Sequence, residues 1–190
     1  LGDVYKRQAL SSTGRKPIAV RWVDVNKGDD TEPNYKSRLV AKEIKKYCDW
    51  SLFAATPPWE AIKTLFSPAV TEGIGWLGSK QKGKKIEVID VKRAYFYASA
   101  RRNVFIELPD EDSHPGMCTR DAANNWELEY CEFLISIGFV RGKSVPCSFR
   151  HAKSDMCLVV HGDAFTILGY ESDLDWLNRE MRKKFEIEST

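Results

Sequence analysis

The pattern of apolar and polar residues predicts a β-hairpin late in the chain. Residues 156–160 (MCLVV) and 165–168 (FTIL) are apolar and favour β-structure, and residues 161–164 (HGDA) between them contain turn-forming Gly and Asp. Asp163 should therefore lie at the tip of the hairpin, where Asp is an ordinary turn residue. A carboxylate held on a rigid turn also suits a metal ligand, so the pattern alone leaves both interpretations open.

Further strands are predicted from alternating or continuous apolar runs. They are expected at residues 19–25, 35–44, 85–91, 103–108, 146–150 and 185–188. A polar cluster with Gly, Asp and Pro separates the first two, which predicts a hairpin with a long loop. Residues 92–98 fit a turn or a short helix, and residues 1–17 are expected to be a linker or an artefactual N-terminus.

Helices are predicted at residues 56–70, 121–137 and 172–184, where apolar side chains recur at helical spacing. Thr56 fits the N-cap of the first helix, and Ser172 with Asp175 fits a capping box in the last. Pro68 should kink or end the first helix. The apolar stripe of that helix is expected in the core; it comprises Trp59, Ile62, Leu65, Phe66, Ala69 and Val70. Together these elements predict an α+β fold with helices packed on an antiparallel sheet.

Composition adds a few limits. The 190 residues carry a net charge of +2, which says little about partners, but residues 80–102 are mainly basic and residues 107–132 acidic. The basic band can mark a phosphate-binding face, although a solvated loop is the simpler explanation for its SKQKGKK run. Five cysteines without a CxxC pair argue against a disulfide framework and favour a reducing, intracellular compartment.

The chain ends and its apolar runs also carry expectations. The chain begins at Leu1 rather than Met and stops at Thr190 without a closing element, so we expect an internal segment of a longer polypeptide. No signal peptide is visible, and no apolar run approaches the roughly 18 residues of a membrane span. We therefore expect a protein that is neither secreted nor in a membrane.

Asp90 and Asp163 form the main candidate site, because each lies at the end of an apolar strand. If the two strands are neighbours, the carboxylates converge at one edge of the sheet and repel unless they bind a proton or a divalent cation. Mg²⁺ prefers such oxygen ligands, and two ions can support in-line phosphoryl transfer. The chain has no Gly-rich phosphate loop and no G-x-S-x-G nucleophile motif.

Two other patterns leave alternatives open. Lys36, Arg38 and Lys42 recur at even spacing on one predicted strand face, which fits either phosphate contacts or the protection of a sheet edge. A repeated C-x3-H spacing makes a zinc site conceivable, although the closely spaced Cys pair of most structural sites is absent. That spacing involves Cys147, His151, Cys157 and His161.

Seven segments, in order, resemble the reverse transcriptase domain of copia-type LTR retrotransposons, whose gag-pol polyproteins contain it. They are RWVDVNKGD with YKSRLVAKE, TPPWEAIKTLF, IDVKRAYFYA, VFIELP, TRDAANNWELEYCEFLISIGFVRGKSVPCSF, VVHGDAFTILG and LDWLNREMRKKFEI. The resemblance covers the chain from about Arg21 to its end. It implies a fingers-like region at 18–84 and a palm-like region at 85–190 with a ferredoxin-like antiparallel sheet, while the thumb is missing.

The resemblance also implies roles for individual residues. Asp90 and Asp163 would bind two Mg²⁺ ions, and Tyr95 would sit under the sugar and exclude a 2′-hydroxyl. Phosphates of template or nucleotide would be contacted by Lys36, Arg38 and Lys42. The implied activity is RNA-directed DNA polymerisation, with an RNA template, a DNA primer and deoxynucleoside triphosphates as partners. RNase H and integrase regions of the polyprotein, and an intracellular location such as a virus-like particle, are implied too.

Two departures from the family pattern weaken the expected activity. Ala164 stands where the family has a second consecutive aspartate, and PGMC runs directly into TRDAANNW at residues 116–119, where about ten more residues are usual. We therefore expect polymerase activity to be absent or very weak. The alternative is a non-catalytic relic or nucleic-acid-binding module of the same fold.

Overall fold

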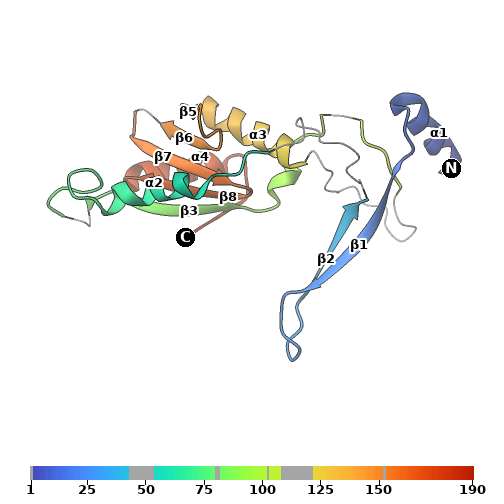
Figure 1. The fold of residues 1–190 in the computed structure, drawn as a ribbon, viewed down its shortest axis with the longest axis horizontal. Coiled ribbons are helices and arrows are strands. Elements are labelled where there is room, and N and C mark those ends of the chain that lie inside the picture. Colours follow the sequence, from blue (N-terminus) through green and yellow to red (C-terminus); the bar gives the residue numbers. More distant parts are fainter. Residues whose placement is uncertain (1, 43–53, 80–81, 102, 108–121, 152) are drawn as a thin grey trace. The chain divides into compact units, whose positions relative to one another are not determined.

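The computed structural model describes residues 2–42, 54–79, 82–101, 103–107, 122–151 and 153–190 (Figure 1). The chain divides into two compact units, which are described separately: Leu1–Phe53 with Ser99–Asn125, and Ala54–Ala98 with Trp126–Thr190. The expected boundary between a fingers-like and a palm-like region after residue 84 stays a prediction, because a division by contacts alone does not test it.

The first unit contains a helix and a small sheet. Its elements are α1 (Gly2–Thr13), β1 (Ile18–Asn26), β2 (Tyr35–Ala41) and β4 (Ile106–Glu107), in the sheet order β2-β1-β4. The β1–β2 hairpin confirms the prediction from the alternating pattern. Residues 1–17, expected to be a linker or an artefactual N-terminus, contain helix α1, and that expectation stays a prediction. Gly14 ends this helix: its φ is +66°, and its N–H donates to the Leu10 carbonyl at 2.9 Å. A glycine just after a helix is a common C-terminal signal, so this helix end could be read from the sequence.

The second unit is built on a six-stranded antiparallel sheet in the order β5-β6-β7-β8-β3-β9. The strands are β3 (Lys85–Val91), β5 (Phe139–Arg141), β6 (Ser148–His151), β7 (Met156–His161), β8 (Ala164–Gly169) and β9 (Ile187–Ser189). All but β5 were predicted. The mixed α+β class and the antiparallel sheet with packed helices are therefore confirmed for this unit.

Helices pack on both faces of this sheet (Figure 1). Helices α3 (Ala122–Ser136) and α4 (Glu171–Arg182) contribute Trp126, Leu134, Leu177 and Met181 to the larger core, against inward residues of β3, β7 and β8. Trp126 is its aromatic centre, with ring centroids 5.3–6.3 Å from those of three neighbouring rings. Burial of each large apolar side chain contributes about 1.5–3 kcal/mol. Most of the stabilisation that this unit gains from apolar burial therefore comes from this face of the sheet.

Helix α2 (Trp59–Val70) covers the other face through a smaller cluster. Only Leu65 is fully buried on it, whereas Trp59, Phe66 and Val70 are 73%, 46% and 77% exposed. The expectation that the whole stripe lies in the core was therefore wrong for these three residues. One helix against one sheet face buries a narrow strip, so the flanking apolar positions stay in solvent.

The predicted helix starts also needed correction. Helix α2 begins three residues after Thr56, because each residue before a proline avoids the α conformation and Pro57 and Pro58 follow. Pro68 lies in the last turn, as expected for a residue that ends the helix. Helix α4 begins at Glu171 with Tyr170 as its N-cap and no side-chain cap bond, so the capping box at Ser172 was wrong.

The remaining predicted elements fall close to their expected positions. Residues 92–98 include the short 3₁₀ helix η3 (Ala94–Phe96). The strand expected at 103–108 is limited to β4, and its last residue lies outside the described part of the chain. No helix in the described part is long and apolar enough to cross a membrane.

Gly138, which follows α3, is predicted to be intolerant of a side chain. Its φ is +101°, and an added Cβ would lie 2.8 Å from His151 Nε2. Gly138→Ala should lower the free energy of unfolding by about 2–4 kcal/mol, because backbone strain and overpacking add. Gly73 is a matched control, since it has φ +83° and nothing within 4 Å of an added Cβ.

Urea unfolding of both variants checks this prediction. Gly73→Ala should cost only the backbone strain of about 1–2 kcal/mol. Equal losses in the two variants would mean that His151 moves aside without cost.

Candidate functional site

The β7–β8 hairpin carries the candidate site, and its turn is held from two sides. Gly162 and Asp163 form a two-residue loop, with φ +66° at Gly162, the first loop position. The indole Nε1–H of Trp126 donates to the Gly162 carbonyl at 2.8 Å, and the Val91 N–H donates to the Asp163 carbonyl at 3.0 Å. The predicted hairpin, with Asp163 at its tip, is confirmed.

Asp90 lies in β3 between strands β8 and β9. Its direct cross-strand neighbours are Ala164 on β8 and Glu188 on β9. Direct neighbours in an antiparallel sheet point to the same face with Cβ atoms about 4.5–5.5 Å apart. Since Asp163 directly precedes Ala164, the structure brings the two sequence-predicted carboxylates, Asp90 and Asp163, to the same end of the sheet.

This end of the face lies beyond the cover of helix α2. On β3, Ile86, Val88 and Asp90 share the face on which α2 packs, because side chains alternate along a strand. Ile86 packs against the α2 cluster, but Val88 is 38% exposed and Asp163 is exposed. The carboxylates are therefore accessible from solvent.

The electrostatics of the site follow from this placement. Burial raises the pKa of the Asp90 carboxyl above 3.8, and the negative charges of Asp163 and Glu188 raise it further. The Lys92 ammonium lies 2.7 Å from a Glu188 carboxylate oxygen and 3.4 Å from one of Glu186. Lys92 thus offsets part of the negative charge on β9, but the charges around Asp90 still favour binding of a cation.

The donor set suits a hard divalent cation. Among the residues that the structure describes, no three His, Cys, Asp or Glu side chains form a group that could hold a metal. Mg²⁺ usually binds protein through one or two carboxylates and keeps several waters. Asp90 and Asp163 fit that limited requirement, and they are the two residues that could hold Mg²⁺ here.

Tyr95 lies close to the same turn. It belongs to η3, which follows Arg93, a residue with φ +53°. A Cβ placed on Gly162 would be 3.7 Å from the Tyr95 hydroxyl oxygen, and the Tyr95 ring packs against the main core. The structure therefore places three of the predicted site residues, Asp90, Tyr95 and Asp163, around one turn.

The predicted phosphate-binding residues belong to the first unit. Lys36 and Arg38 are exposed on β2, and the Lys42 N–H extends the hairpin by donating to the Ala19 carbonyl at 2.7 Å. Their even spacing puts all three on one face. The register adds Arg21, which lies opposite Val40 on that face. Strand β2 is also a sheet edge, so edge protection remains an additional role for these cations.

A zinc site is incompatible with the strand register. Cys147 and His151 belong to the face of α3 and α4, where the His151 ring lies 5.3 Å from that of Trp176. Cys157 packs on the α2 side, and His161 follows it at an even spacing on β7. Because the two pairs face opposite sides of the sheet, they cannot share one ion.

Three residues near the carboxylates were not anticipated from the sequence. Glu188 faces Asp90, Lys92 neutralises Glu188, and Trp126 holds the turn. Of the three, only Trp126 could have been found from the sequence, because it belongs to the apolar stripe of its predicted helix. The altered junction at residues 116–119 lies outside the described residues.

Asp90→Asn is predicted to stabilise the fold at neutral pH. The raised pKa of Asp90 means that its ionised form is disfavoured in the folded state, so stability falls as pH rises from about 3.8 through the folded-state pKa. The variant should gain up to about 1 kcal/mol at pH 7, the usual scale of a like-charge cross-strand pair. Thermal unfolding at pH 7 and at about pH 3, where the gain should vanish, checks this; a loss at pH 7 would contradict it.

Comparisons of the chain with protein-family models, with curated proteins and with solved structures find no match.

Proposed function

We propose that this chain is a reverse-transcriptase-like fingers-and-palm segment whose polymerase site is weakened or lost. The observation that carries the proposal is the meeting of Asp90 and Asp163 at an uncovered end of the sheet. The sequence resemblance assigns these two residues to metal binding, and the strand register supplies the proximity which that role requires. An RNA template, a DNA primer and deoxynucleoside triphosphates are the proposed ligands.

Each of the proposed functional residues, taken within its own unit, has a physical task. Asp90 and Asp163 supply anionic oxygens, and divalent ions bound there would neutralise developing charge during in-line nucleotidyl transfer. Tyr95 lies beside the turn and would limit the space for the sugar. The cations of β2 would bind phosphates. Phosphoryl transfer depends mainly on such positioning and charge neutralisation.

Ala164 is the reason to expect weak or absent catalysis. It lies directly opposite Asp90, where an aspartate would add a carboxylate to the same face. The methyl group of alanine offers no ligand to a metal. With one carboxylate fewer, the remaining pair should bind divalent ions weakly and leave them poorly positioned.

Restoring the carboxylate is predicted to strengthen metal binding. Ala164→Asp should tighten Mn²⁺ binding by about tenfold or more, because ligand charge strongly sets the affinity of carboxylate sites. Asp90→Asn and Asp163→Asn should each weaken it. Isothermal titration with Mn²⁺ measures these affinities, and primer extension on a primed RNA template should show no robust synthesis by the unmodified chain.

Thr166→Asp is a matched control for Ala164→Asp. Thr166 lies on the same strand and face, two residues further on, opposite Val88 rather than Asp90. A carboxylate there adds the same charge but should not reproduce the gain. The proposal of a weakened polymerase site would be refuted if both variants tightened Mn²⁺ binding equally. Processive synthesis by the unmodified chain would refute it too.

A second candidate function is nucleic-acid binding without catalysis. The observation that favours it is the basic face of the β1–β2 hairpin, formed by Arg21, Lys36, Arg38 and Lys42. No acidic residue shares that face over the paired residues of the hairpin. Such a strip can neutralise successive phosphates without reading the bases.

Salt-dependent binding tests this second candidate. Lys36→Ala and Arg38→Ala should each reduce the slope of log K against log salt by about one, measured by fluorescence anisotropy with labelled single-stranded RNA. Lys63→Ala removes an exposed cation from α2 and should leave the slope unchanged. If the β2 substitutions and Lys63→Ala have equal effects, the hairpin face does not bind phosphate.

A further inference from the structure

The outer edge of β9 leaves backbone groups without partners among the described residues. Val88 and Thr190 exchange two hydrogen bonds, of 3.1 and 3.0 Å, and the Lys92 N–H donates to the Glu186 carbonyl at 2.9 Å. In an antiparallel pair, hydrogen-bonded and non-hydrogen-bonded positions alternate. Residues 187 and 189 therefore turn their N–H and C=O groups away from β3.

The opposite edge of β3 confirms this alternation. Val91 faces Ile187 across the strands, yet its N–H donates to Asp163 on the other side of β3. Ile187 thus has no hydrogen-bonding neighbour in β3. Strand β9 is the last strand of the sheet order, so its outward groups form an open edge in the described part of the chain.

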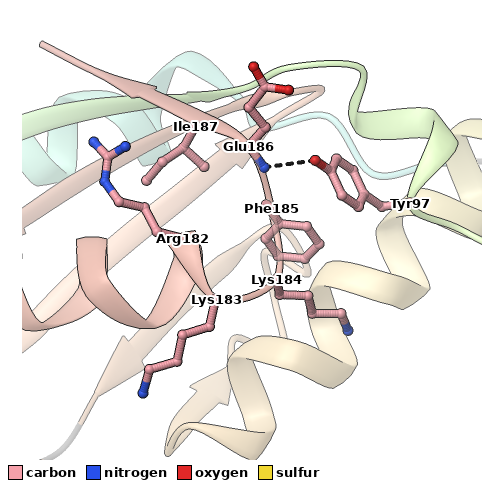
Figure 2. Close-up of a pocket in the computed structure, with 7 residues that line it drawn as sticks. All are labelled: Tyr97, Arg182, Lys183, Lys184, Phe185, Glu186 and Ile187. Carbon is pink, nitrogen blue, oxygen red and sulfur yellow. Dashed lines mark hydrogen bonds between the residues drawn. The ribbon is translucent and has the colours of Figure 1, made fainter.

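A pocket of about 420 Å³ lies at the beginning of β9 (Figure 2). It is lined by Tyr97, by Ile187 and by the residues that connect α4 to β9, which are Arg182, Lys183, Lys184, Phe185 and Glu186. The Glu186 N–H donates to the Tyr97 hydroxyl oxygen at 2.7 Å, which fixes the beginning of the edge.

The charges of the pocket favour an anionic occupant. Lys183 pairs with Glu180 and Lys184 pairs with Glu129, each at 2.6 Å. Arg182 is exposed and has no ion pair within the described residues. The Glu186 carboxylate points away from the lysine side chains (Figure 2) and lies near Lys92. Arg182 is thus a cation next to the open backbone edge.

We propose that β9 accepts an extended acidic peptide segment as an additional strand of the sheet. The backbone groups of Ile187 and Ser189 bind its main chain, and Arg182 binds a carboxylate on its side chain. Strand addition of this kind takes its affinity from main-chain hydrogen bonds and its specificity from neighbouring side-chain sites. The interaction is separate from the carboxylate pair and goes beyond the proposed function.

A second copy of the chain is a poorer occupant. Two β9 edges paired in antiparallel fashion with Ile187 opposite Ser189 place the two Glu188 residues opposite each other. If Ile187 instead lies opposite itself, Glu188 faces Glu186. Like charges at directly opposed positions are destabilising, so the charges disfavour both of these registers for two copies of the chain.

Peptide binding by the 190-residue chain tests the proposal. The probe is a labelled, β-favouring peptide of Thr and Val with Asp on one face, compared with the same peptide carrying Lys. The acidic peptide should bind with Kd below about 1 mM, and the Lys peptide at least about tenfold more weakly. Ser189→Pro should weaken binding about fivefold, since it removes one outward donor.

Two matched variants keep the test interpretable. Ser189→Ala retains the N–H and should bind normally, while Ser189→Pro should keep its melting temperature because edge strands tolerate proline when the N–H faces solvent. Arg182→Gln should weaken binding of the acidic peptide, whereas Arg179→Gln, an exposed arginine one turn earlier, should not.

Three results would overturn the proposal. They are no binding up to about 1 mM, equal binding of the Asp and Lys peptides, and unchanged binding by Ser189→Pro. A dimer of the unmodified chain in analytical ultracentrifugation that Ser189→Pro abolishes would assign the edge to a second copy instead.

Discussion

The hydrogen bonds that hold the Gly162–Asp163 turn are the constraint on which the candidate site depends. Trp126 donates to one residue of the turn and Val91 to the other. Because Trp126 is also the centre of the aromatic core, the position of the turn is set by the best-packed part of the unit. Asp163 therefore stands beside Asp90 without any contact between the two side chains being needed to hold it there.

The placement of Asp163 beside Asp90 causes electrostatic repulsion at the end of the sheet. Asp90 is partly buried beside two other carboxylates, and the pKa of Asp90 is raised in consequence. Lys92 relieves the charge on β9 by binding Glu186 and Glu188, but Asp90 has no such ion pair among the described residues. Perturbed carboxyl pKa values cluster at functional sites, so the raised pKa of Asp90 supports the proposal that this carboxylate pair binds a cation.

Periodicity predicted elements and faces well, but it did not predict neighbours. The hairpin at Asp163 and the strand ending near Asp90 followed from runs of apolar residues, and two-residue alternation placed Lys36 and Arg38 on one face. The pairing of β9 with β3 is a long-range contact, so nothing in the local sequence placed Glu188 opposite Asp90. The exposed side of α2 has the same origin: the pattern marked Trp59 as apolar, but the narrow contact with the sheet left it in solvent.

Ala164 takes on a physical meaning from the pairing of β3 and β8. An aspartate at this position would face Asp90 directly and would add a further negative charge to those of Asp163 and Glu188. Without a bound cation that charge would lower stability further, and with one it would add a ligand. Alanine removes both effects at once. Under the proposed function, a chain with Ala164 should therefore depend less on metal for folding and should bind metal less well than one with aspartate at this position.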